Sequence, residues 1–352
     1  MTPVSRIVVT GASGKVGGMI AAMLARDGIP QTLLVRDAAR APVLPGADVV
    51  VADFRDPASV RTALQPGDRV FMVSVHENVE ARIEAHQSFV DAASGIGVGL
   101  MAYLSIVNPS ATAAFHHGRS HAATERMLLE SGMPYAFLRM NLFLDDLPLW
   151  FDPDGVCRGP GGDGRVALIS REDTAAVSAG VLVGPGYENE ALDLTGEQSL
   201  SLGELAALCS DVLDRPLRYE PGTREAWLES RIEAGVPPWD ANIGVGSYEA
   251  LLRGEFDVTS DVVRRVTGKP AQSASLLGGG EPGELRQPRG RCAPRTARPP
   301  VTISLRAWVP RAGRAGSRRV LAGHRRRAPG CARALRRTRG RRAARGWIPR
   351  AR

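Results

Sequence analysis

Short apolar runs alternate with amphipathic stretches through residues 1–140. The apolar runs, rich in β-branched residues, predict strands at Arg6–Thr10, Gln31–Val35, Ala47–Val51, Arg69–Val73, Gly97–Leu104 and Tyr135–Arg139. Apolar residues at helical spacing predict helices at Lys15–Asp27, Asn78–Ala93 and Ser120–Ser131. Apolar strands that alternate with helices indicate a parallel sheet covered on both faces. We therefore predict an α/β fold with a doubly wound Rossmann sheet.

After Arg139 the alternation becomes looser. Asp152–Gly164 is rich in glycine and proline and is predicted to form a loop over the carboxyl edge of the sheet. Strands are expected at Val166–Ile169, Ala191–Leu194 and Leu217–Glu220, and helices at Asp173–Val183, Leu202–Leu213, Arg224–Ala234 and Tyr248–Arg253, with Asp173 capping its helix. We predict a Rossmann core over residues 1–150. From residue 151 to 270, a small substrate lobe is expected to pack on it.

Residues 271–352 differ in composition from the rest of the chain. They contain 22 arginines, no lysine and only two acidic residues, whereas residues 1–270 hold 23 basic and 35 acidic residues. The overall charge of +8 therefore combines an acidic domain with a basic tail, so nucleic-acid binding is not expected of the domain. The tail is predicted to be disordered. Out-of-frame translation of a GC-rich gene is favoured over a functional basic arm.

The cysteine, histidine and hydropathy patterns argue against disulfides, a metal site, a secretory signal and a membrane span. The cysteines, Cys157, Cys209, Cys292 and Cys331, show no ligand spacing and are expected to be unpaired thiols. His116 and His117 have no acidic partner at ligand spacing, so no metal site is predicted. No secretory signal and no membrane-spanning stretch are visible, which favours a cytoplasmic domain. The sequence leaves open whether the domain forms a homodimer.

A glycine-rich loop follows the first strand and opens the first helix. The spacing Gly-x-x-Gly-x-x-Gly over Gly11, Ala12, Ser13, Gly14, Lys15, Val16 and Gly17 is typical of dinucleotide binding. Gly11 permits the tight turn, Gly14 lets the backbone approach a diphosphate, and Gly17 lets the helix pack against the strand. The N–H groups at the helix start favour the phosphate anions.

The ends of later strands supply further candidate ligands. Arg36 ends the second strand, where a forked guanidinium suits the 2′-phosphate of NADP(H), although Asp37 could bind a ribose instead. Asp53 and Phe54 follow the third strand and are candidates for binding adenine, whereas Asp56 before Pro57 is expected to cap a helix. The cofactor ribose and nicotinamide are expected at further strand ends, at Ser74, Val75, Ser105 and Ile106.

Several segments together resemble the NmrA-like branch of the atypical short-chain dehydrogenases. They are TGASGKVGG, VRD, ADFRDP, YLS, HAATERMLLESGMPYAFLRMNLF and REDTAAV, with LTG and TGKP as later landmarks. The resemblance is greatest to the quinone oxidoreductase type 2 and triphenylmethane reductase group and runs from Arg6 to about Lys269. It implies an NADP(H)-binding enzyme that reduces a quinone-like or aromatic acceptor by direct hydride transfer. The family's usual closing helix would follow Pro270, where this chain turns to glycine and arginine.

No tyrosine is followed four residues later by lysine, the pair that ordinary short-chain dehydrogenases use as a proton donor. Hydride transfer would then depend on positioning of the acceptor over the nicotinamide. A redox-sensing protein that binds NADP without turnover is the alternative, and a sugar-nucleotide epimerase is disfavoured by the missing pair.

The candidate catalytic residues are His121, Ser105 and Asn141. His121 occupies the position where isoflavone-reductase-like relatives carry lysine, so the resemblance implies contact with the nicotinamide ribose or a proton relay; a helix-start histidine without a catalytic role is equally open. Asn141 and Arg139 end a strand that faces the same crevice, although Arg139 could instead pair with Glu125.

Overall fold

The computed structural model describes residues 5–273. The arginine-rich tail beyond Ser273, and with it the predicted disorder, the frameshift interpretation and the missing closing helix, lie outside these residues. None of the helices within residues 5–273 is long and apolar enough to cross a bilayer.

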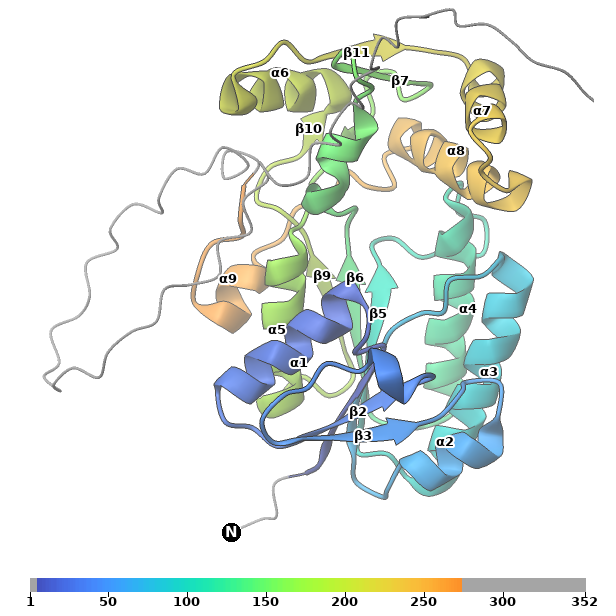
Figure 1. Cartoon of the computed structure of the whole chain (residues 1–352), viewed down its shortest axis with the longest axis vertical. Coiled ribbons are helices and arrows are strands. Elements are labelled where there is room, and N and C mark those ends of the chain that lie inside the picture. Colours follow the sequence, from blue (N-terminus) through green and yellow to red (C-terminus); the bar gives the residue numbers. More distant parts are fainter. Residues whose placement is uncertain (1–4, 274–352) are drawn as a thin grey trace, which may run out of the picture. The chain divides into compact units, whose positions relative to one another are not determined.

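The main sheet contains seven strands in the order β3-β2-β1-β4-β5-β6-β9 (Figure 1). Their bounds are β1 Ile7–Thr10, β2 Gln31–Val35, β3 Ala47–Val51, β4 Arg69–Met72, β5 Leu100–Ile106, β6 Tyr135–Met140 and β9 Glu190–Leu194. All pairings in this sheet are parallel. The predicted doubly wound parallel sheet is confirmed.

Helices cover both faces of the sheet (Figure 1). One face carries α1 (Lys15–Arg26), α5 (Arg171–Val183) and α9 (Val262–Thr267), and the other carries α2 (Pro57–Ala63), α3 (Val79–Ile96) and α4 (His116–Glu130). Successive strand side chains point to opposite faces, so Val9 packs in the apolar cluster beneath α1 and α5, whereas its neighbour Val8 packs beneath α2 and α3. Burial on both faces explains why the central strands β1 and β5 are mostly apolar, whereas the edge strands β3 and β9 are partly exposed and contain acidic residues.

The chain reverses direction across the sheet between β1 and β4. From β1 it winds outward through β2 and β3, and it then returns to β4 on the other side of β1. In open α/β sheets, ligands bind in the crevice at such a switch point, outside the carboxyl ends of the strands. The glycine loop after β1 and the segment after β4 lie at this crevice.

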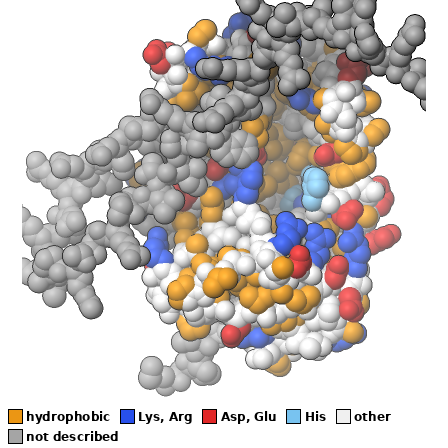
Figure 2. All heavy atoms as spheres, viewed as in Figure 1, with side chains coloured by type: hydrophobic (Ala, Val, Ile, Leu, Met, Phe, Trp, Pro, Cys, Tyr) orange, Lys and Arg blue, Asp and Glu red, His pale blue; other side chains and the backbone are white. Residues whose placement is uncertain are grey.

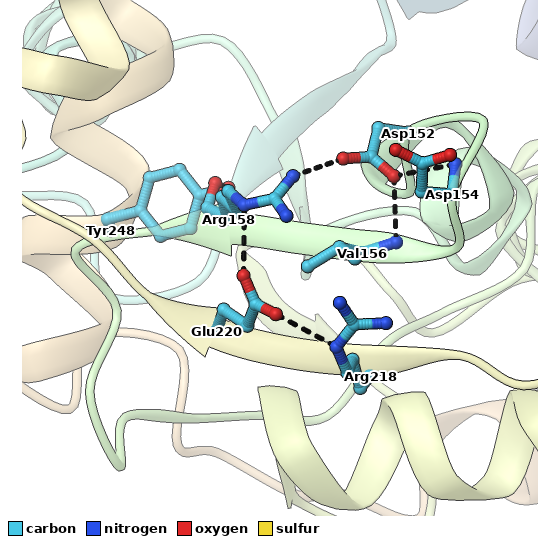
Figure 3. Close-up of polar contacts among 7 residues, drawn as sticks. All are labelled: Asp152, Asp154, Val156, Arg158, Arg218, Glu220 and Tyr248. Carbon is cyan, nitrogen blue, oxygen red and sulfur yellow. Dashed lines mark hydrogen bonds and ion pairs between the residues drawn. The ribbon is translucent and has the colours of Figure 1, made fainter.

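A smaller lobe lies beyond the carboxyl edge of the sheet (Figure 1). It consists of the 3-10 helix η2 (Leu144–Trp150), strands β7 (Val156–Gly159), β8 (Arg165–Val166), β10 (Leu200–Ser201) and β11 (Arg218–Pro221), and helices α6 (Leu202–Leu213), α7 (Arg224–Glu233) and α8 (Pro238–Leu252). Strand β7 pairs with β11, and β8 with β10. Figure 3 shows the ion pairs on the first of these sheets, where Arg158 joins Asp152 and Glu220, and Arg218 also binds Glu220.

The sheet does not end at the expected boundary of residue 150. Strand β9 is its seventh strand, and α5 and α9 cover one of its faces. The lobe is therefore discontinuous in sequence, because the chain returns to the sheet between β8 and β10. Two-stranded pairs are too small to stand alone, so the lobe packs on the sheet.

Several predicted element bounds require correction. Helix α4 begins at His116 rather than Ser120. Helix α8 begins at Pro238 rather than Tyr248, because proline is tolerated in the first turn of a helix. Strand β5 begins at Leu100, because Gly97 ends α3 in the left-handed conformation at φ 84°. The segment expected to be a loop contains β7, and the strand expected at Val166–Ile169 is reduced to β8. Helix α9 was not predicted.

Candidate active site

A cavity of about 930 Å³ lies between the carboxyl edge of the sheet and the lobe. Figure 2 shows hydrophobic side chains inside this hollow, with histidine and Lys/Arg side chains beside it. From the sheet, its lining includes Gly11, Ser13, Gly14, Lys15, Val16, Gly17, Arg36, Asp37, Arg40, Asp53, Phe54, Ser74, Val75, Arg82, His117 and His121. From the lobe, its lining includes Trp150, Leu202, Trp227, Arg231, Tyr248 and Leu251. Its size is in the range of cofactor-binding clefts.

The glycine loop lies as the sequence predicts, between β1 and α1. Gly11 has φ 62°, and a Cβ there would lie 2.4 Å from Val73 Cγ1. A Cβ on Gly17 would lie 2.4 Å from the carbonyl oxygen of Gly11. No side chain caps α1 at Gly14, and its first turn contains no acidic residue. The N–H groups at this helix start are therefore available to an anion.

Two arginines lie beside the glycine loop on the β2 side. Arg36 follows β2, Arg40 ends the 3-10 helix η1 (Ala38–Arg40), and both line the cavity. Neither forms an ion pair among the described residues. The Asp37 carboxylate is instead engaged, because it accepts a hydrogen bond from the Ala39 N–H at 3.0 Å. The free cations at this position fit a phosphate on the adenosine ribose.

The adenine candidates differ in their accessibility. Asp53 lines the cavity while its carboxylate accepts a hydrogen bond from the Arg55 N–H at 2.9 Å. Phe54 is mostly buried and stacks on Phe89 with ring centroids 4.0 Å apart, so it offers only part of its ring to the cavity. Asp56 caps α2 as predicted, by accepting from Ala58 N–H. Ala12 is buried in the apolar core and is not among the residues that line the cavity.

A continuous chain of hydrogen bonds runs from α3 to the end of β4. Arg82 Nη2 lies 2.7 Å from His121 Nε2, His121 Nδ1 lies 2.9 Å from the Tyr103 hydroxyl, and that hydroxyl lies 3.2 Å from Ser74 Oγ. Because a guanidinium can only donate, Nε2 must accept, and the proton of His121 is on Nδ1. His121 Nδ1–H therefore donates to Tyr103, and either hydroxyl can be the donor between Tyr103 and Ser74. When Tyr103 donates, the Ser74 proton is available to the cavity that Ser74 lines.

A second buried imidazole supports this arrangement. His86 Nε2 accepts from the Val75 N–H at 3.2 Å, and its Nδ1 lies 2.8 Å from Thr124 Oγ1. Burial, assisted by the charge of Arg82, lowers the pKa of His86 to about 3. The same causes lower the pKa of His121 well below its ordinary value. Both rings are therefore neutral near pH 7, and burial raises the pKa of Tyr103, which keeps its proton.

The structure does not bring Ser105 and Asn141 to the cavity, which corrects their predicted catalytic role and the predicted cofactor contact of Ser105. Both side chains are fully buried. Ser105 donates to Glu125 at 2.6 Å, and Asn141 donates to the Phe256 carbonyl at 2.9 Å. Glu125 also binds Arg139 through two hydrogen bonds, which confirms the structural alternative for that arginine. These polar groups satisfy each other inside the protein and are not available to a ligand.

One further expectation fails. Asp173 does not cap α5: Ser170 is the N-cap residue, its hydroxyl accepting from the Asp173 N–H, while the Asp173 carboxylate accepts from Gln272 N–H at 2.7 Å. Within residues 5–273, no group of three or more His, Cys, Asp or Glu side chains is placed to hold a metal ion.

Cys157 and Cys209 are buried and unpaired.

Sequence reasoning missed several residues that line the cavity or the hydrogen-bond chain. Arg82 and His86 lie four residues apart on one face of α3, and Tyr103 lies within β5. An arginine and a histidine at helical spacing on a buried face were the available signal, because such groups are seldom buried without a partner. Trp227 and Arg231 are also four residues apart, on α7, which has no buried residues, so burial gave no signal there.

Comparison with known proteins relates most of the described residues to one family. The model of the NmrA-like family matches residues 3–250. NAD(P)H azoreductase of Xenophilus azovorans is 30% identical over 272 residues, which are 76% of this chain and 94% of that protein.

Solved structures of similar proteins include two with a nicotinamide cofactor. The NADPH-dependent quinone oxidoreductase of Escherichia coli, complexed with NADPH, has a TM-score of 0.72 at 26% identity, with 78% of this chain and 98% of that chain covered. Triphenylmethane reductase of Citrobacter sp., complexed with NADP(H), has a TM-score of 0.71 at 27% identity, with 78% and 99% covered.

Proposed function

The chain belongs to the NmrA-like family, and from that premise we propose that it is an NADPH-dependent oxidoreductase that reduces a quinone-like or aromatic acceptor. The observation that carries the proposal is one cavity that joins an uncapped glycine loop with unpaired arginines to a largely apolar space beneath the lobe. Its relatives include an azoreductase, a quinone oxidoreductase and a dye reductase, so the shared substrate class is an electron-poor conjugated system.

The residues at one end of the cavity fit NADPH. The N–H groups at the start of α1 would hold the diphosphate, Arg36 and Arg40 the 2′-phosphate, and Asp53 with the exposed part of Phe54 the adenine. Ser74 and Val75 follow β4, next to β1 in the sheet, and would lie beside the nicotinamide. When bound, the nicotinamide supplies a hydride.

Reduction of a quinone to a hydroquinone consumes one hydride and one proton. If Tyr103 donates to Ser74 at the end of the chain from Arg82 and His121, the Ser74 hydroxyl can donate into the cavity. We assign to Ser74 the hydrogen bond to the acceptor oxygen that gains charge, with water supplying the proton. His121 orients Tyr103 and is not itself a proton donor, because Arg82 occupies its Nε2.

Loss of NADPH absorbance in the presence of naphthoquinone tests the proposal. We expect stoichiometric formation of hydroquinone under nitrogen, so that oxygen cannot consume the NADPH. Tight NADPH binding without turnover on quinones, azo dyes and triphenylmethane dyes would overturn it and favour the redox-sensing alternative.

Replacement of Ser74 with alanine tests the assigned donor. Since one donor in an oxyanion-binding site contributes roughly a hundredfold to kcat, we expect S74A to lower kcat by about that factor, with NADPH affinity nearly unchanged. Ser5 is exposed and does not line the cavity, so S5A is the control. An unchanged kcat in S74A would remove Ser74 from the mechanism.

A further inference from the structure

Two arginines without carboxylate partners line the part of the cavity away from the 2′-phosphate site. Arg82 is 5% exposed, and its Nε has no hydrogen-bond partner. Arg231, on α7 of the lobe, also has a buried Nε without a partner, and its guanidinium carbon lies 5.0 Å from the centroid of the Trp227 ring. Neither arginine forms an ion pair among the described residues. Buried cations are normally paired, because removal of a charge from water is costly.

A third polar group in this region is equally unsatisfied. His117 lines the cavity, and its buried Nδ1 has no partner. Burial and the neighbouring charges of Arg82, His76 and His116 lower the pKa of His117 to about 3, so the ring is neutral near pH 7. Buried polar nitrogens without hydrogen-bond partners are a reason to look for a ligand, and the N–H groups of the two guanidiniums require acceptor oxygens.

No acidic side chain on the cavity wall is free to balance these arginines. The acidic residues that line the cavity are Asp37, Asp53 and Asp146. Asp37 and Asp53 follow β2 and β3, on the opposite side of β1 from β4, and Asp146 pairs with Arg171 at 2.5 Å. The excess positive charge therefore lies on the β4 and lobe side of the cavity.

Several surface arginines of the lobe are ion-paired. Arg158 and Arg218 bind Glu220 (Figure 3), and Arg224, on the same helix as Arg231, binds Glu249 at 2.8 Å. Arg231 lines the cavity without an ion pair to any described residue, and it lies beside the aromatic rings of Trp227 and Tyr248, whose centroids are 5.6 Å apart in a T-shaped arrangement. Aromatic surface therefore lies next to a charge.

We propose that Arg82 and Arg231 bind an anionic oxygen substituent of the acceptor, a carboxylate, sulfonate or phosphate, while the aromatic rings of the lobe hold its apolar part. That the bound anion is the electron acceptor rests on the proposed function. That an anion binds at these arginines does not. The phosphates of NADPH do not explain these arginines, because the glycine loop, Arg36 and Arg40 are assigned to them. The preferred acceptors are therefore anionic aromatic compounds rather than neutral quinones.

Binding of inert ligands tests the site without any turnover. Naphthalene sulfonate, naphthoate and naphthyl phosphate are titrated by calorimetry into the full chain saturated with NADP⁺, with naphthalene methanol as the neutral comparison. We expect the anions to bind roughly ten- to hundredfold more tightly than the alcohol, the range of a charge-assisted hydrogen bond. Their ranking identifies which oxygen group the site fits.

Variants of α7 assign the effect to Arg231. R231M is expected to remove most of the preference for the anion, R231K to retain part of it, and R224M, which alters an ion-paired arginine on the same helix, to leave it unchanged. Equal affinity for anion and alcohol in the wild-type protein, or equal losses for both in R231M, would overturn the proposal. A loss of NADPH affinity in R231M would also overturn it, by assigning the arginine to the cofactor.

Turnover separates the two proposals. With naphthoquinone and its sulfonate as acceptors, R231M should raise KM for the sulfonate and leave kcat/KM for the neutral quinone within about twofold, since the neutral quinone has no anionic oxygen for the guanidinium to bind. If neither quinone oxidises NADPH but the inert anions still bind, the anion site stands and the reductase proposal fails. If the neutral quinone is reduced and the sulfonate has no lower KM than the neutral quinone, the reductase proposal stands and the anion site fails.

Discussion

The two ends of the cavity are built in different ways. The glycine-loop end uses backbone N–H groups and two arginines from segments close together in sequence, Gly11–Gly17 and Arg36–Arg40. The other end uses side chains from α3, α4 and α7, which are more than a hundred residues apart at their extremes. Backbone geometry fixes the first end, whereas packing of the lobe on the sheet fixes the second.

This difference separates what each end can recognise. Backbone donors at a helix start suit any diphosphate and depend on glycine more than on a particular side chain. Side chains held by hydrogen bonds, such as Arg82 on His121, give a site its own charge and shape. Cofactor identity should therefore follow the loop and Arg36, and acceptor identity should follow the lobe.

The largest effect is expected from a methyl group in the loop. In G17A the new Cβ would lie 2.4 Å from the Gly11 carbonyl oxygen and 2.9 Å from that of Thr10, so α1 must move from β1. We expect NADPH affinity to fall by roughly a hundredfold and the free energy of unfolding by about 2 kcal/mol. Fluorescence titration and urea unfolding measure both.

Gly95 provides the matched control for G17A. It lies in α3, and a Cβ there would have no heavy atom within 4 Å. G95A should bind NADPH normally and be at least as stable as the parent, because alanine favours a helix. If G17A bound NADPH as well as G95A, the close contact of α1 with β1 would not be what positions the phosphate donors.

The sequence predicted the part of the fold in which local pattern and tertiary context agree. The strands Gln31–Val35 and Ala47–Val51 match their predicted bounds, because each ends in three consecutive aliphatic residues and is bounded by turn residues. The predicted start of α8 at Tyr248 was wrong, because the helix begins at Pro238, and proline is tolerated in the first turn. Strand β9 was predicted, but its place in the main sheet depends on a return of the chain that no local pattern shows.

The candidate site divides in the same way. The glycine loop, Arg36, Asp53 and Ser74 line the cavity as predicted, since strand ends in a parallel sheet meet at one edge. Ser105 also follows that logic, yet its hydroxyl points to Glu125 inside the protein. Which way a side chain points at a strand end is decided by partners on α4, and these are not visible from β5 alone.

Removal of the Arg36 charge should affect the choice of cofactor next most strongly. R36Q loses a charge-assisted contact to the 2′-phosphate, so we expect NADPH affinity to fall roughly ten- to hundredfold. NADH lacks that phosphate and should bind within about threefold of the parent. Arg61 is an exposed arginine on α2 that does not line the cavity, and R61Q is the control. Equal losses for NADPH and NADH would assign the 2′-phosphate to other residues.

Acid should destabilise the protein because His86 and His121 are buried in their neutral forms. The pKa of His86 is lowered to about 3 and that of His121 is also lowered, mainly by burial. An unfolded histidine takes up a proton below about pH 6.5, whereas these folded ones do not. Stability present above that pH is therefore lost as the pH falls toward the folded pKa, by about 1.4 kcal/mol per pH unit for each ring.

Urea unfolding between neutral pH and about pH 5 measures this loss. In H86Q, glutamine can still accept a hydrogen bond from the Val75 N–H. The free energy of unfolding should then fall less steeply with decreasing pH, by about 1.4 kcal/mol per pH unit, because one buried histidine is gone. A slope identical to that of the parent protein would mean that the His86 ring is not kept neutral by its surroundings.

The smallest effect on activity is expected at Ser105, although it ends a strand next to β4. Its hydroxyl donates only to Glu125, which keeps two hydrogen bonds from Arg139 when the serine is removed. S105A should therefore lower the free energy of unfolding by about 1 kcal/mol and leave kcat/KM with naphthoquinone within about twofold, in contrast to the loss expected for S74A. A fall in kcat as large as that of S74A would show that Glu125 and β5 control the acceptor after all. Acceptor reduction would then depend on buried residues behind the cavity wall as well as on the side chains that line the cavity.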